Sequence, residues 1–227
     1  MQSQTYSIGV IGGTGPQGKG LAYRFARAGH RVFLGSRSPE RAREAARELG
    51  ARLPAAARAV SGTSNATAAS VNDVVLLAVP WNGHAELVAG LCDELAGKIV
   101  ISCVNPLGFD KRGPYGLPVS EGSAAEQAAR LLPGSRVVGA FHHVSAVSLL
   151  GDAECLDAED VLVCGDDAAA KGVVQELVCS VTGRTGVDAG ALRLARQLEP
   201  LTAVLISINK KYKTHSGVAV TGLTRSH

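Results

Sequence analysis

The sequence predicts an α/β fold with a doubly wound, mainly parallel sheet, and three observations lead to this fold class. Short apolar segments alternate with segments of helical periodicity along most of the 227 residues. A glycine-rich turn, Gly12-Gly13-Thr14-Gly15, follows the first apolar segment and precedes the first helical one. The segments also follow one another at the spacing of β-α-β units, in which crossover helices join parallel strands and cover both faces of the sheet.

The first half of the chain contains five apolar segments of strand length. We expect strands at 6–11, 31–35, 58–61, 73–79 and 98–103. Between them we expect helices from Gln17 to the stop signal Gly29, over 39–49 with a proline in the first turn, over 66–70 and over 84–95. This half therefore accounts for most of a parallel sheet.

The second half is expected to add a small C-terminal α/β extension. The segment 105–119 is rich in glycine and proline and is interpreted as an ordered loop. Ser123 and Glu126 form a capping box for a helix over 123–132. Strands at 136–141, 161–164 and 185–188 and a helix at 167–182 follow. A last helix carries the stripe Leu194, Leu198, Leu201, Leu205 and Ile208, and Pro200 should kink it or start a second helix.

The composition excludes several classes of protein. With 46% hydrophobic and 19% charged residues the chain can bury a core, and its longest apolar runs are too short to cross a membrane. The first residues lack the features of a signal peptide. The five cysteines form no C-x-x-C pair, which argues against a metal site, and their odd number favours reduced thiols in the cytoplasm. A net charge of +3 does not suggest nucleic-acid binding but suits an anionic small molecule.

The glycine-rich turn matches the pattern G-x-G-x-x-G, in Gly13-Thr14-Gly15-Pro16-Gln17-Gly18. Alone this pattern is weak, but here it follows an expected strand and opens an expected helix. Gly13 would permit the tight turn, Gly15 would let the backbone approach a pyrophosphate, and the third glycine would pack helix on strand. Free N–H groups at the helix start favour a phosphate. The turn therefore predicts a Rossmann-type dinucleotide site.

The end of the second strand indicates which dinucleotide binds. Ser36-Arg37-Ser38 and Arg41 occupy the place where an acidic residue would accept hydrogen bonds from the ribose of NAD. An arginine there can pair with the 2′-phosphate of NADP instead. The alternative is a solvated arginine-rich helix face, to which we assign the later arginines up to Arg58. We therefore expect NADP(H).

Two further segments are expected on the same edge of the sheet. Val79-Pro80-Trp81-Asn82-Gly83-His84 follows the fourth strand, and Phe141-His142-His143 follows the sixth. Trp81 could form a wall of a nicotinamide pocket or could simply cover the core. His84 and His142 could contact a ligand or be structural. No catalytic acid, base or nucleophile motif is recognisable.

The segments "GGTGPQGKGLAYR", "GSRSPERA", "AVPWNGHAE", "VVGAFHHVSA", "VLVCGDD" and "DAG.L" together resemble the NADPH:coenzyme F420 oxidoreductases, and the ending "LTAVLISINKKYKTHSGVAVTGL" is similar to their actinobacterial branch. The resemblance runs from about Ser7 to Val220. It implies a Rossmann domain with a small C-terminal part, usually in a dimer. It also implies reversible hydride transfer between NADP(H) and C5 of the deazaflavin coenzyme F420.

The resemblance also implies site residues. Phosphate contacts would fall on Thr14, Gly15, Pro16 and Gln17, and 2′-phosphate contacts on Ser36, Arg37 and Arg41, with Ser38 beside them where archaeal members have a basic residue. Contacts in the reaction pocket would fall near Val79, Trp81, His84, Val104, Ala140 and His142. We expect residues 1–145 to form the NADP-binding domain and 146–227 to complete the deazaflavin pocket.

Other functions and partners stay open at this point. The chain could be an NADP-dependent imine or keto-acid reductase, or a sensor that binds NADP(H) without catalysis. We expect a homodimer through the leucine stripe, although the stripe could equally pack on the chain's own sheet. Lys210, Lys211 and Lys213, with Arg225, could guide an anionic coenzyme or could be a solvated helix end.

Overall fold

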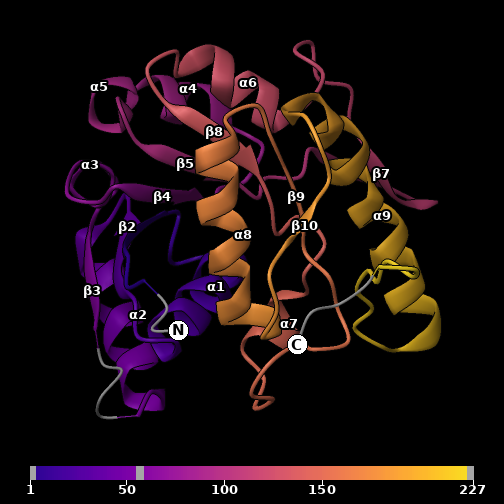
Figure 1. The fold of residues 1–227 in the computed structure, drawn as a ribbon, viewed down its shortest axis with the longest axis horizontal. Coiled ribbons are helices and arrows are strands. Elements are labelled where there is room, and N and C mark those ends of the chain that lie inside the picture. The colour runs from indigo at the N-terminus through magenta and orange to yellow at the C-terminus, as the bar shows by residue number, and fades with distance from the viewer. Residues whose placement is uncertain (1–3, 55–58, 224–227) are drawn as a thin grey trace.

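The computed structural model describes residues 4–54 and 59–223 and contains an eight-stranded sheet (Figure 1). Its strands are β1 (Ser7–Ile11), β2 (Arg31–Ser36), β3 (Val60–Ser64), β4 (Val74–Leu77), β5 (Ile99–Ser102), β8 (Arg136–Gly139), β9 (Leu162–Gly165) and β10 (Val187–Asp188). They lie in the order β10-β9-β8-β5-β4-β1-β2-β3. Every neighbouring pair is parallel except β8 and β9, which are antiparallel. The expected doubly wound, mainly parallel fold is confirmed.

The helices cover both faces of this sheet. They are α1 (Pro16–Arg27), α2 (Pro39–Arg52), α3 (Asn65–Ser70), α4 (His84–Ala89), α5 (Cys92–Leu95), α6 (Ala124–Leu131), α7 (Ala146–Leu149), α8 (Ala168–Thr182) and α9 (Ala195–Tyr212). Ile8 and Val10 of β1 pack in the core that includes α1, α2 and α8. Ile11 points to the opposite face and packs in the core that includes α3, α4, α6 and α9. This alternation follows from the two-residue period of a strand.

Two local expectations are wrong, and one of the two alternatives expected at Pro200 is excluded. The expected loop 105–119 contains an antiparallel hairpin of β6 (Leu107–Asp110) and β7 (Gly113–Gly116), whose connection includes a left-handed glycine, Gly113, with φ 118°. The expected helix 84–95 is divided into α4 and α5, because the weak helix former Gly90 caps α4. Pro200 does not start a second helix, since α9 continues through it. The third strand begins later than expected, and Arg58 lies outside the described residues.

The C-terminal part continues the sheet of the N-terminal part. β9 and β10 add to the edge formed by β8, so the sheet crosses the expected domain boundary at residue 145. Figure 1 shows α9 at the outer side of the molecule, where it packs against β7. In the part of the chain that the structure describes, no helix has the length and apolarity needed to cross a membrane.

Arg24 of α1 joins the two parts through a buried guanidinium group. The side chain is fully buried and donates hydrogen bonds to backbone carbonyls that follow α7 or belong to its last residues. Nε donates to Leu149 at 2.7 Å, Nη1 to Ala153 at 2.7 Å and Nη2 to Ser148 at 2.9 Å. The carbonyls at a helix end lack hydrogen-bond partners inside the helix, and the guanidinium group of Arg24 supplies donors for them. Its positive charge also interacts favourably with the negative end of the helix dipole.

We predict that Arg24→Met lowers the free energy of unfolding by about 3 kcal/mol or more, because several buried carbonyls lose their donors. Denaturant unfolding followed by circular dichroism measures this change. Arg27→Met is the matched control, since Arg27 lies on the same helix but its one bond to Ala153 is exposed and 3.3 Å long. If both variants lose the same free energy of unfolding, the buried hydrogen bonds of Arg24 contribute no more to stability than the exposed bond of Arg27.

Candidate active site

The carboxyl ends of β1, β2 and β4 border a cleft of about 810 Å³. It lies where β1 is flanked by β2 on one side and β4 on the other. At this switch point the crossover connections diverge, and doubly wound sheets bind ligands there. The cleft is lined by Gly12, Thr14, Gly15, Ser36, Arg37, Ser38, Arg41, Asn65, Ala78, Val79, Pro80, Asn82, Gly83, Glu86, Leu87, Gly90 and Leu91.

The glycine-rich turn forms one wall of this cleft. Its left-handed residue is Gly12, with φ 76°, which precedes the three glycines of the pattern. A Cβ on Gly13 would lie 2.8 Å from Leu34 and 3.0 Å from the Val10 carbonyl, so the turn can pack this closely only with a glycine at that position. A Cβ on Gly18 would lie 2.9 Å from the Gly12 carbonyl, as expected for a residue that packs helix on strand. Gly15 is different, because a Cβ there would meet nothing nearer than 3.5 Å.

The end of β2 brings two uncompensated positive charges to the opposite wall. Ser38 caps α2 by accepting a hydrogen bond from the Arg41 N–H at 3.4 Å, and its own N–H donates to Ser36 Oγ at 3.2 Å. Arg37 and Arg41 are exposed at the cleft. Among the described residues neither forms an ion pair. Their charges are therefore available to an anionic ligand.

The start of α1 lies between this cleft and a second cavity. Pro16 is the exposed first residue of the helix, where its missing N–H costs nothing. The Gln17 side chain turns away from the cleft and donates to the carbonyls of Phe141 and Val144, both at 3.3 Å. Only its backbone N–H, in the first turn of α1, is left for a ligand in the cleft.

The segment after β4 divides its residues between the cleft and the core. Val79 lines the cleft, whereas Trp81 and His84 do not. The rings of Trp81 and His84 pack on each other with centroids 5.4 Å apart. His84 is buried and its Nδ1 lies 2.8 Å from Gln127 Oε1 on α6, and burial lowers its pKa. The structure thus shows a packing contact between α4 and α6 for His84.

A second cavity of about 290 Å³ lies on the other side of Gln17. It is lined by Gln17, Cys103, Asn105, His142, His143, Val144, Ser145, Ala146, Thr202, Leu205, Ile206, Asn209 and Ser216. Val104 and Ala140, which the resemblance places near the reaction pocket, are buried in the two cores and line neither hollow. His142 is the one expected pocket residue, apart from Gln17, that borders this cavity.

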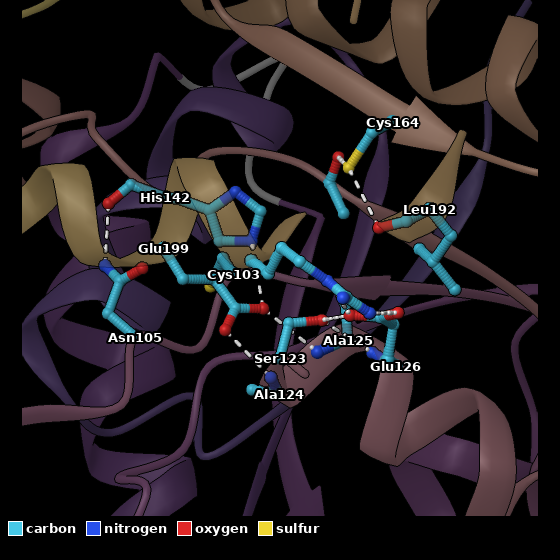
Figure 2. Close-up of polar contacts among 12 residues, drawn as sticks. Cys103, Asn105, Ser123, Ala124, Ala125, Glu126, His142, Cys164, Leu192 and Glu199 are labelled. Atoms are coloured by element: carbon cyan, nitrogen blue, oxygen red, sulfur yellow. Dashed lines mark hydrogen bonds and ion pairs between the residues drawn. The ribbon is translucent and has the colours of Figure 1, made fainter. Parts of the chain in front are cut away.

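Polar side chains that sequence reasoning missed surround His142 (Figure 2). Asn105 Nδ2 and Thr202 Oγ1 donate to its carbonyl at 2.7 and 2.8 Å. Glu199 Oε1 lies 4.0 Å from its Nε2. Asn105 follows β5, which is a signal that strand-end reasoning could have used. Thr202 and Glu199 lie on α9, and no local pattern places that helix beside residue 142.

Other sequence-based candidates lie away from both hollows. Lys210, Lys211 and Lys213 are exposed at the end of α9, and Lys213 is its left-handed cap with φ 51°. None of the three lines the cleft or the second cavity. Arg225 lies outside the described residues. In the described part of the chain, no group of histidine, cysteine and carboxylate side chains is arranged to hold a metal ion.

Comparison with known proteins gives the chain its family. The family model described as "NADP oxidoreductase coenzyme F420-dependent" matches residues 7–106. The F420-dependent NADP reductase of Methanothermobacter thermautotrophicus is 39% identical, and the alignment covers 95% of each chain. That of Methanocaldococcus jannaschii is 37% identical over 95% of this chain and 98% of the relative.

A solved structure agrees with these relatives. The crystal structure of a candidate F420-dependent NADP reductase from Arthrobacter sp. FB24 is 30% identical and superimposes with a TM-score of 0.78. It covers 95% of this chain and all of that chain. The family resemblance in the sequence is thereby confirmed over nearly its whole length. This chain belongs to the F420-dependent NADP reductases, a family of oxidoreductases.

Proposed function

We propose that this protein catalyses reversible hydride transfer between NADP(H) and C5 of the deazaflavin coenzyme F420. The observation that carries the proposal is the pair of hollows on either side of the start of α1. The larger one is lined by Arg37 after β2 and Arg41 of α2, which form no ion pair among the described residues, and the smaller one borders His142. Family membership supplies the identity of the two ligands. Mixing the protein with NADPH and F420 and following the loss of the oxidised deazaflavin's absorbance tests the activity directly.

The residues of the cleft fit NADP(H). The backbone N–H groups of Thr14 and Gln17 lie at the positive end of α1, which favours a pyrophosphate. The open space at Gly15 is the approach that the pyrophosphate needs. Arg37 and Arg41 would pair with the 2′-phosphate, with the hydroxyl groups of Ser36 and Ser38 beside them.

We place the deazaflavin ring in the second cavity, with its reacting edge toward the nicotinamide. When bound, NADPH supplies a hydride that the deazaflavin accepts at C5. The protein's contribution is to hold the two rings together in a pocket without water, because hydride transfer between carbon centres depends on proximity and alignment. Val79 borders the cleft side, and Asn105, His142 and Thr202 border the cavity side. Trp81, His84, Val104 and Ala140 would support these walls from behind.

We also propose that the protein is a cytoplasmic homodimer. Several exposed apolar side chains lie on α9 and on the hairpin beside it, where Phe109 is 68%, Val204 53% and Tyr212 68% exposed. They differ from the leucine stripe, of which Leu205 is buried in the chain's own core. An apolar surface of this kind supports a contact between copies. All five cysteines are free thiols, which suits a reducing compartment.

The first prediction from this assignment concerns cofactor choice. We expect at least tenfold preference for NADPH over NADH, because one charge-assisted contact contributes about 1.5–3 kcal/mol. Arg37→Ala should raise KM for NADPH and leave KM for NADH nearly unchanged in steady-state assays. Arg47→Ala, an exposed arginine of α2 that does not line the cleft, is the control. Equal losses for both nucleotides would contradict the 2′-phosphate contact.

The second prediction concerns the glycine turn. Gly15→Val should abolish NADPH binding in titration calorimetry without unfolding the protein, since no described atom lies within 3.4 Å of the position of the added Cβ. Gly172→Val on α8, where a Cβ also meets open space, should bind normally. A folded Gly15→Val protein that still binds NADPH with native affinity would place the pyrophosphate elsewhere.

The third prediction concerns assembly. Light scattering at micromolar concentration should give twice the mass of the 23.3 kDa chain. Val204→Glu should shift the protein to the mass of one chain, because the charge would be buried at the contact. Val71→Glu changes a valine that is equally exposed, at 54%, but lies after α3. A monomeric wild-type protein would refute the dimer, and dissociation by Val71→Glu alone would move the contact to another face.

A further inference from the structure

A buried glutamate and a buried histidine face each other beside the second cavity (Figure 2). The reaction proposed above gives no role to the imidazole ring of this histidine or to the carboxylate of this glutamate. The side chains of Glu199 and His142 are 2% and 0% exposed, and Glu199 Oε1 lies 4.0 Å from His142 Nε2. Neither nitrogen of the ring has a hydrogen-bond partner among the described residues. A buried ring whose two nitrogens have no hydrogen-bond partner is costly, so the pairing with Glu199 calls for a role.

The Glu199 carboxylate is held in place by the start of α6. Its Oε2 accepts the Ala124 N–H at 2.8 Å and its Oε1 accepts the Ala125 N–H at 3.0 Å. Both N–H groups belong to the first turn of α6 and have no acceptor inside the helix. The helix dipole also favours a negative charge at this end. Burial opposes ionisation more strongly than these bonds favour it, and it raises the pKa of Glu199 to about 7. The carboxylate is therefore oriented even though it ionises only near neutrality.

The backbone carbonyl of His142 is held by two side chains that line the cavity. Its carbonyl accepts Asn105 Nδ2–H and Thr202 Oγ–H, and both donors line the cavity. The ring packs against Gly139, where the Cβ of any larger residue would lie 3.1 Å from the ring carbon Cε1. Burial lowers the pKa of His142 to about 3, which leaves the ring neutral at working pH.

The other charged or titratable groups near this pair have partners of their own. On α6, Glu126 forms an ion pair with Arg196 of α9 and accepts a hydrogen bond from the Ser123 hydroxyl. On β9, burial raises the pKa of the Cys164 thiol to about 12, so it stays protonated. Behind the ring, His143 Nε2 lies 3.0 Å from the Asp160 carbonyl, and burial lowers its pKa. The pKa of Glu199 lies near neutral pH, so its charge changes next to His142 in that range.

We propose that Glu199 is a positioning residue for the second cavity and acts through His142. The ionised carboxylate attracts the Nε2–H form of the neutral ring and fixes its orientation. A fixed ring also holds the His142 carbonyl in place. Asn105 and Thr202, which donate hydrogen bonds to this carbonyl, then keep the side-chain orientations with which they line the cavity. α9 therefore holds His142 twice, through Glu199 at the ring and through Thr202 at the carbonyl. The effect on catalysis rests on the proposed placement of the deazaflavin in this cavity.

The kinetic test is the pH dependence of Glu199→Gln. At pH 8 the variant should lose at least tenfold in kcat/KM for F420, while Kd for NADPH stays within twofold. Since glutamine resembles the protonated carboxyl group, wild type should fall toward the variant as pH drops through about 7, and the two should agree within threefold at pH 6. A difference that is the same at pH 6 and pH 8, or an equal loss of NADPH affinity, would overturn the proposal.

Two further variants test whether the effect passes through His142. Glu126→Gln removes a carboxylate of α6 whose charge contributes to the raised pKa of Glu199. It should keep wild-type kcat/KM at pH 8 and lower the pH at which activity falls, and it should not reproduce the loss of Glu199→Gln. In a His142→Asn background, Glu199→Gln should cause no further loss, because its target is gone. Full additivity of the two substitutions would show that Glu199 acts by another route.

A measurement without any substrate separates this inference from the placement of the deazaflavin. Nitrogen NMR of protein labelled at histidine should show His142 with its proton on Nε2 at pH 8 in wild type and a different tautomer in Glu199→Gln. If the tautomer is unchanged, the pair is not coupled and the proposal fails. If the tautomer responds while kcat/KM for F420 does not, the role in catalysis fails because the deazaflavin does not depend on this cavity.

Discussion

The candidate site depends on the way α1 holds the segment that follows β8. Gln17 and Arg24, two turns apart on α1, both donate to backbone carbonyls between residues 141 and 154. The same helix begins directly after the glycine turn, whose Thr14 and Gly15 line the larger cleft. One rigid element thus fixes the distance between the two hollows. Hydride transfer is sensitive to such a distance, since a small misplacement of the reacting atoms costs much of the rate.

The two hollows differ in the way their polar groups are balanced. The larger cleft presents Arg37 and Arg41, which have no ion-pair partner in the described part of the chain, and water can solvate their charges until an anion binds. The second cavity is bordered by neutral groups such as Asn105 and Thr202, and the two histidines that also line it are buried and have lowered pKa values. An open, charged cleft suits a ligand with three phosphates, and a drier pocket suits the transfer of a hydride.

Much of the fold could be predicted from the sequence because its signals are local. Strand length, helix periodicity and the glycine turn are set by neighbouring residues, and Ser36, Arg37 and Arg41 follow from their place after a strand. The hairpin β6–β7 could not be predicted, because its glycines and prolines are equally typical of a loop. The orientations of Gln17 and His84 depend on partners more than 40 residues away, Phe141 and Gln127. Glu199 and Thr202 come from a helix whose docking no local pattern determines.

The two ends of the sheet bear on how copies of the chain can meet. One edge strand, β3, is Val-Ser-Gly-Thr-Ser, and the other, β10, has two residues. A short or polar border offers few unpaired backbone groups and little apolar surface to a strand from another molecule. Edge-to-edge pairing into a continuous intermolecular sheet is therefore disfavoured, which protects a parallel sheet of this size from aggregation. Self-association is left to side chains on a helix or a hairpin, where it can close with two copies and stop.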